Sequence, residues 1–182
     1  VHINTIMDYS FFWIISLYEY YKTYGDKDFL EQIQDQMKAV MDFCLERRDE
    51  DGFMRGKPGD WVFIDWAPMD KTGALCGEQI LFAKAMECYA AICAVIGRDD
   101  RGLGEEAKKL RSQIFEKFYD TEKKVFIDSY ESGKRNVTRQ SNILAYLFLS
   151  CDDTVKKDIY ERVVLNDEVP QITTPYFKFY EN

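Results

Sequence analysis

Apolar residues in this chain of 182 residues form helical patterns of two kinds, which alternate along the sequence. Residues 6–21 are apolar on nearly every face of a helix, whereas residues 28–48 carry one apolar stripe opposite a charged face. Helices of the first kind should be buried, and those of the second kind half exposed. The same alternation predicts further helices at 72–96, 105–118, 140–149 and 153–164. Thr174 and Pro175 then predict a seventh helix, because a cap residue precedes a proline at the first helical position.

The alternation of buried and exposed helices is typical of helical hairpins that pack side by side, with one layer facing inward. The fold class expected from it is all-α, with helical hairpins forming part of an (α/α)6 toroid or barrel. Three and a half hairpins do not close a ring, so we expect residues 1–182 to form a single domain that is a central arc of it. The chain starts VHINTIMDY, without an initiator methionine or a basic leader, which indicates a start inside a longer protein.

Two longer connections between helices are expected to form short β excursions. In the first, residues 53–55 and 61–64 flank a Gly-Lys-Pro-Gly turn, and in the second, residues 124–128 are followed by 130–134. Each connection leads from an exposed helix to a buried one, so both loops should project from the same end of the helical layer. Loops gathered on one rim of a rigid scaffold are where binding usually resides.

Composition excludes several classes of function. Lysine and arginine number 24 against 32 aspartate and glutamate, a net charge of −8, which argues against nucleic acid and anionic membranes as partners. No membrane span is expected, because Asp8 interrupts the apolar run near the N-terminus. His2 is the only histidine, so acid–base chemistry would fall to carboxylates. No metal site or cofactor is expected, because the cysteines lack zinc-binding spacing and Cys44, Cys88 and Cys93 lie in apolar helical stretches.

The segment 59–66 holds the densest set of chemically useful side chains. Two Asp-Trp pairs, Asp60-Trp61 and Asp65-Trp66, place flat apolar rings beside carboxylates. This combination suits sugars, because rings stack on C–H faces while carboxylates accept hydrogen bonds from hydroxyl groups. The structural alternative is that the tryptophans anchor the loop onto the helices and the aspartates cap turns.

Three further polar residues are candidates for an inward-facing site. Asp8 lies in an aromatic helix start, where it is either a buried functional carboxylate or an N-terminal cap. Gln140 and Asn142 open an inward helix and could reach a central cavity, with capping or packing as the alternative.

Six short strings, taken in order, resemble the bacterial α-L-rhamnosidases. The match is to the catalytic six-hairpin (α/α) barrel of glycoside hydrolase family 78, and it spans essentially the whole chain. The strings are DYS at 8–10, YGD at 24–26, WVFIDWA at 61–67, DKTG at 70–73, RQSN at 139–142 and TTPYF at 173–177.

This resemblance implies an inverting glycosidase that releases terminal α-L-rhamnose from glycans, with a general acid and a general base on two carboxyl groups. Family members carry the acid before the region that matches Asp8 and the base after the region that matches Phe177. We therefore expect no catalytic residue in this chain and no activity of the chain alone. The resemblance carries over the substrate-binding residues Asp65 and Trp66 as a wall of the rhamnose pocket, with Trp61, Asp60 and Asp8 less directly matched.

The partners implied are a rhamnose-containing glycan and the remaining segments of the parent protein. An incomplete ring would also leave apolar surface uncovered at 11–15 and 176–180, which predicts self-association. No feature selects among the bacterial periplasm, the exterior and the cytoplasm.

Two alternatives remain open at this point. One is another carbohydrate-active enzyme of the helical-toroid type, although a lyase would more typically need a histidine or arginine paired with tyrosine. The other is a non-catalytic helical-hairpin scaffold, which would show a repeat of fixed period that this sequence lacks.

Overall fold

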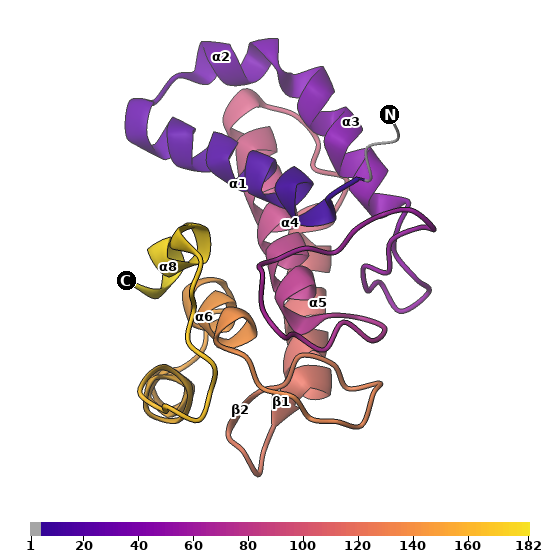
Figure 1. Cartoon of the computed structure of the whole chain (residues 1–182). Helices are drawn as coiled ribbons and strands as arrows, with labels where there is room; N and C mark the ends of the chain where they lie inside the picture. Colours follow the sequence, from indigo (N-terminus) through magenta and orange to yellow (C-terminus); the bar gives the residue numbers. More distant parts are fainter. Residues whose placement is uncertain (1–4) are drawn as a thin grey trace. The chain divides into compact units, whose positions relative to one another are not determined.

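The structure is a computed structural model that describes residues 5–182, so that His2 lies outside the described residues (Figure 1). Contacts divide the chain into two compact units. Among the described residues, unit 1 comprises 5–62 and 81–110, and unit 2 comprises 63–80 and 111–182. The fold is mostly helical, as the alternating pattern predicted.

Unit 1 contains a helical hairpin at its N-terminal end. Helix α1 (Met7–Tyr24) contacts α2 (Lys27–Gln32) and α3 (Gln34–Leu45), which follow it in the chain (Figure 1). The unit also takes most of α4 (Cys76–Ile96) and the first half of α5 (Leu103–Phe118). The short turn after the first helix thus joins helices that pack together.

The turn between α1 and α2 is built by Gly25 and Asp26. Gly25 takes a positive φ of 68° and its N–H donates to the Tyr21 carbonyl at 2.8 Å, which ends α1. Asp26 caps α2, because its Oδ1 accepts a hydrogen bond from the Phe29 N–H at 3.0 Å. The predicted single helix at 28–48 is wrong in one respect: it is divided at Ile33, whose ψ of 8° departs from helical geometry.

Helix α1 is not covered on most sides, which corrects the expectation for it. Its buried residues form one face, consisting of Met7, Asp8, Phe11, Ile14, Ile15 and Leu17. Tyr9 is 51% exposed on another face, and Trp13 is also exposed. Aromatic rings with a polar atom tolerate partial contact with water, so their presence on a helix does not require burial. The apolar seam expected at 11–15 is therefore mostly buried inside unit 1.

The charged helix α5 and the apolar helix α4 follow the predicted pattern. In α5 the stripe Leu103, Ala107, Leu110, Ile114 and Phe118 is buried. Among the described residues, α4 is the helix whose length and composition would allow it to cross a membrane, but 67% of its most apolar window is buried. That burial is what a core helix shows. Helix α4 begins at Cys76 and not at Thr72, since Gly73 has a positive φ of 65° in the preceding loop.

Unit 2 is built around α6 (Arg139–Phe148). This helix contacts α7 (Asp153–Ile159), the π-helical turn η1 (Tyr160–Val164) that continues α7, and α8 (Pro175–Glu181). Helices α6 and α8 lie side by side (Figure 1). Pro175 occupies the first turn of α8, as predicted.

The β excursions differ from those expected. Residues 53–55 and 61–64 do not pair with each other, and single bridges instead join Met54 to Arg48 and Trp61 to Ile6. The second excursion contains a short antiparallel pair, β1 (Tyr119–Asp120) with β2 (Val125–Phe126). Residues 125–126 thus pair with residues 119–120, which directly follow α5, and not with 130–134.

Candidate functional site

Asp65 is held from two sides in unit 2. Its side chain is nearly inaccessible, at 2% exposure. Gln140 Nε2 donates to Asp65 Oδ2 at 2.8 Å, and Thr174 Oγ1 donates to Asp65 Oδ1 at 2.6 Å. Gln140 lies in the first turn of α6 and Thr174 immediately precedes α8. Asp65 therefore ties its loop to the N-terminal ends of both helices.

Trp66, the next residue, is 70% exposed. Its ring packs edge-to-face on Phe63, with the ring centroids 5.1 Å apart. Most of the surface of this residue is therefore accessible to a ligand. Asp65 and Trp66 thus have different properties: the carboxylate is buried and fully engaged, while the indole presents an apolar face to solvent.

The other three predicted substrate-binding residues lie in unit 1. The Asp60 carboxylate accepts hydrogen bonds from Arg47 Nε and from the Lys57 N–H, both at 2.7 Å. Trp61 donates its N–H to the Thr5 carbonyl at 2.7 Å, which places it beside the start of α1.

Asp8 is fully buried in the first turn of α1. The cap position of that helix is occupied by Ile6, so Asp8 is not the N-terminal cap that the sequence left open. Within unit 1 the structure brings Trp61 near the helix start that carries Asp8, whereas Asp60 is engaged by Arg47.

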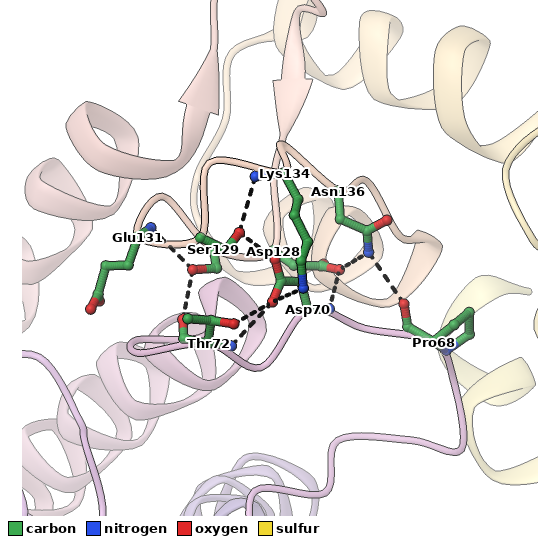
Figure 2. Close-up of polar contacts among 9 residues, drawn as sticks. Pro68, Asp70, Thr72, Asp128, Ser129, Glu131, Lys134 and Asn136 are labelled. Atoms are coloured by element: carbon green, nitrogen blue, oxygen red, sulfur yellow. Dashed lines mark hydrogen bonds and ion pairs between the residues drawn. The ribbon is translucent and has the colours of Figure 1, made fainter.

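A second buried carboxylate, Asp128, organises the loops next to α6 (Figure 2). Its Oδ1 accepts hydrogen bonds from Thr138 Oγ1 at 2.6 Å and Ser141 Oγ at 2.7 Å. Its Oδ2 accepts from Asn136 Nδ2 at 2.6 Å and from the Asp70 N–H at 3.1 Å. Burial raises the pKa of Asp128, and these four hydrogen bonds oppose that rise.

Asp70 uses its own carboxylate to close the same loop. It accepts hydrogen bonds from Thr72 Oγ1 at 2.8 Å and from Ser132 Oγ, and Lys134 Nζ lies 3.7 Å from it. The pKa of Asp70 is lowered, chiefly by the Ser132 hydrogen bond. Ser129 Oγ donates to the Thr72 carbonyl at 2.6 Å, so the side chains of the two loops face each other (Figure 2).

These contacts tie residues 68–74 to residues 128–136. The Asn136 side chain reaches the Pro68 carbonyl at 3.2 Å (Figure 2). Glu131 Oε1 accepts from the Ala74 N–H at 2.9 Å. Within unit 2, residues 68–74 and 128–136, which belong to the two long loops, therefore lie against each other.

The partners of Asp65 and Asp128 could not be predicted from the sequence. Gln140, for which cavity lining and packing were both open, contacts Asp65, whereas Asn142 packs by hydrogen bonding to the backbone of Phe126. Thr174 occupies the predicted cap position of α8, but its hydroxyl group donates to Asp65 instead of capping the helix. Asp128 had no local signal at all, because its partners come from three separate segments.

Within residues 5–182, no group of three histidine, cysteine, aspartate or glutamate side chains is arranged to hold a metal ion. The five cysteines are buried thiols. Burial raises the pKa of the Cys88 thiol to about 11. The site therefore consists of carboxylates, amides, hydroxyl groups and an exposed indole.

The helical hairpins, with the loop that holds Asp65 at the N-terminal ends of α6 and α8, are typical of a domain of the (α/α) hairpin type. Residues 2–172 match the model of the bacterial alpha-L-rhamnosidase 6 hairpin glycosidase domain. The chain belongs to this family, which confirms the resemblance seen in the sequence.

Two solved structures are similar to the chain. The GH78 family rhamnosidase of Bacillus sp. GL1 superposes with a TM-score of 0.84 at 25% identity, over 97% of this chain and 19% of that one. The rhamnosidase from Klebsiella oxytoca with rhamnose bound has a TM-score of 0.81 at 20% identity, over 97% of this chain and 34% of that one. A comparison with curated proteins finds no match. The chain thus spans a fifth to a third of the solved rhamnosidases that it resembles.

Replacing Asp128 by alanine should destabilise unit 2 by about 3–5 kcal/mol, because three buried donors and the half-buried amide of Asn136 would lose an acceptor. Asp128→Asn should cost less, since the hydroxyl groups of Thr138 and Ser141 can rotate and accept from the new amide. Urea unfolding followed by circular dichroism measures both. The exposed Asp167→Ala is the control and should stay within about 0.5 kcal/mol of wild type; equal losses in all three variants would contradict the network.

Acid should weaken the fold through Asp120. Arg135 donates to both oxygens of this carboxylate, at 2.5 and 2.6 Å, and lowers its pKa to about 2 from 3.8. The charged form therefore favours the folded state, and its contribution is present above about pH 4 and lost as the pH falls toward 2. Asp120→Asn should cost about 1–2 kcal/mol at pH 5, allowing for screening at the exposed Arg135, and almost nothing at pH 2. A gap in urea stability that stays constant across this range would rule the mechanism out.

Proposed function

We propose that the protein containing this chain is an inverting α-L-rhamnosidase that releases terminal α-L-rhamnose from glycans or glycosides. Membership of the six-hairpin rhamnosidase family over residues 2–172 is the observation that carries the proposal. This chain would supply part of the sugar pocket on the loop that holds Asp65 and Trp66. The remaining hairpins of the same protein would be its structural partners.

The exposed indole of Trp66 supports a role in sugar binding. A sugar ring presents C–H groups on its faces, and these stack on an aromatic face that is flat and apolar. Phe63 packs on the indole edge-to-face, which leaves a face of the indole accessible. Asp65 is too buried to meet the sugar with its whole carboxylate, so in this proposal it positions Trp66.

The catalytic carboxyl groups are proposed to lie outside this chain. Inversion needs an acid that protonates the leaving oxygen and a base that activates water on the opposite face of the sugar, about 6.5–9.5 Å apart. Asp65 and Asp128 do not suit these roles, because each is buried and accepts hydrogen bonds on both oxygens. The chain alone should therefore bind sugar weakly and hydrolyse nothing.

Trp61, in unit 1, is also proposed as a sugar-binding residue. Its side chain is partly exposed, unlike that of Asp8, which is fully buried. Asp60 is engaged by Arg47, so its part in sugar binding would be indirect. The second candidate function is that of another carbohydrate-active enzyme with the helical-toroid fold. Such an enzyme would hydrolyse a different glycoside.

Trp66→Ala in the full-length protein should reduce kcat/KM for p-nitrophenyl α-L-rhamnoside by about 10–100-fold, because stacking on the sugar would be lost. Tyr160→Ala, which removes another exposed aromatic ring of unit 2, is the matched control and should keep wild-type activity. The isolated chain should be inactive.

Two results would contradict the proposal. If the full-length protein leaves rhamnosides intact but cleaves another α-glycoside, rhamnose is not the sugar that the enzyme recognises. Equal activity of wild type and Trp66→Ala would remove the indole from the pocket.

The isolated chain should also self-associate through α8. Phe179 is 76% exposed and Tyr176 is partly exposed, whereas Phe177 between them is buried. An uncovered aromatic surface of this kind favours association in water. Sedimentation velocity should show concentration-dependent oligomers that Phe179→Ser reduces, and a monodisperse monomer at every concentration would contradict this expectation.

A further inference from the structure

We propose that Gln140 and Thr174 are positioning residues that hold Asp65 and thereby fix the orientation of Trp66. The inference rests on the proposed sugar pocket, and it assigns to two helix ends the task of keeping the stacking surface in place. Neither residue needs to touch the substrate to act in this way.

The loop around Asp65 adopts a conformation that requires support. Ile64, a β-branched residue, has a positive φ of 56°, a region that such side chains rarely occupy. Three successive hydrogen bonds join residues two apart: Asp65 N–H to Phe63 O at 2.6 Å, Ala67 N–H to Asp65 O at 3.0 Å and Met69 N–H to Ala67 O at 2.8 Å. Turns this tight are strained when φ is positive, and they persist only where surrounding contacts hold them.

The two donors supply that support because they fix both carboxylate oxygens. Gln140 binds Oδ2 and Thr174 binds Oδ1, so the Asp65 side chain cannot rotate without breaking one hydrogen bond. A buried carboxylate that lost a donor would also bear a desolvation cost, which favours a shift of the loop toward water. Since Trp66 is the next residue, such a shift would move the indole.

The donors are themselves held in place. Gln140 follows Arg139, whose Nη1 donates to Glu181 Oε1 at 2.8 Å, and both of those side chains are almost fully buried. Glu181 lies at the end of α8 and Thr174 at its start. The contacts thus form a closed circuit from Asp65 through α6 and α8 and back to Asp65, and this circuit fixes the separation of the two donors.

The first test reads the orientation of Trp66 without any substrate. The background is full-length protein in which Trp13→Phe and Trp61→Phe leave Trp66 as the only tryptophan of this chain. Tryptophans elsewhere in the protein are also replaced by phenylalanine. Fluorescence anisotropy and acrylamide quenching then report the mobility of the Trp66 indole. Thr174→Val and Gln140→Met should lower the anisotropy and increase quenching. Thr174→Ser, which keeps the hydroxyl group, should restore wild-type values.

Thr23→Val is the matched control, because the Thr23 hydroxyl group donates to a helix carbonyl in α1, at 2.9 Å, far along the chain from this loop. It should leave both signals unchanged. Signals from Thr174→Val and Gln140→Met that equal those of wild type would overturn the proposal. Unfolding of both variants while Thr174→Ser stays folded would also overturn it, in favour of a purely structural role.

The second test uses hydrolysis of p-nitrophenyl α-L-rhamnoside by full-length protein that keeps all of its tryptophans and carries Thr174→Val or Gln140→Met. Thr174→Val should raise KM by about 10-fold with a smaller effect on kcat, because a displaced indole weakens binding of the sugar. Wild-type KM in both Thr174→Val and Gln140→Met would overturn the assignment. If wild-type protein has no activity on rhamnosides, the proposed function fails, while the fluorescence test still decides whether the two residues position Trp66.

Discussion

The buried carboxylate of Asp128 is the constraint on which the arrangement of residues 68–74, residues 128–136 and the start of α6 depends. A carboxylate removed from water must be matched by donors, and here the donors come from the loop at 70, the loop at 136 and the first turn of α6. Meeting that requirement fixes where α6 begins. Once α6 is fixed, Arg139 and Gln140 project toward α8 and toward Asp65. One buried charge thus determines the placement of the residues that hold another.

Local features of the fold were predictable because they depend on neighbours in the sequence. Gly25 and Asp26 end one helix and start the next through contacts within four residues, and the apolar stripe of α5 has helical spacing. The break at Ile33 carried no such signal, since neither glycine nor proline is present there. The exposed side of α1 was not predicted either, because an aromatic residue counts as apolar in a helical pattern whether it is buried or exposed.

The candidate site was only partly predictable, because its contacts join distant segments. Gln140 is 75 residues from Asp65, and Thr174 is 109 residues from it. No periodic pattern reports pairings of that range. The strings that carried the family resemblance nevertheless contain these residues: 61–67 holds Asp65, 139–142 holds Gln140 and 173–177 holds Thr174. The resemblance therefore pointed to the right segments, and the structure was needed to show that they meet.

The contact between Thr174 and Asp65 has a consequence for the order of events during synthesis. A ribosome releases Asp65 long before the residues that precede α8, so the loop that bears Trp66 cannot receive its second donor while the chain is still short. Closing so long a segment costs chain entropy that local turns do not. The exposed indole should therefore reach its final orientation among the last steps of folding.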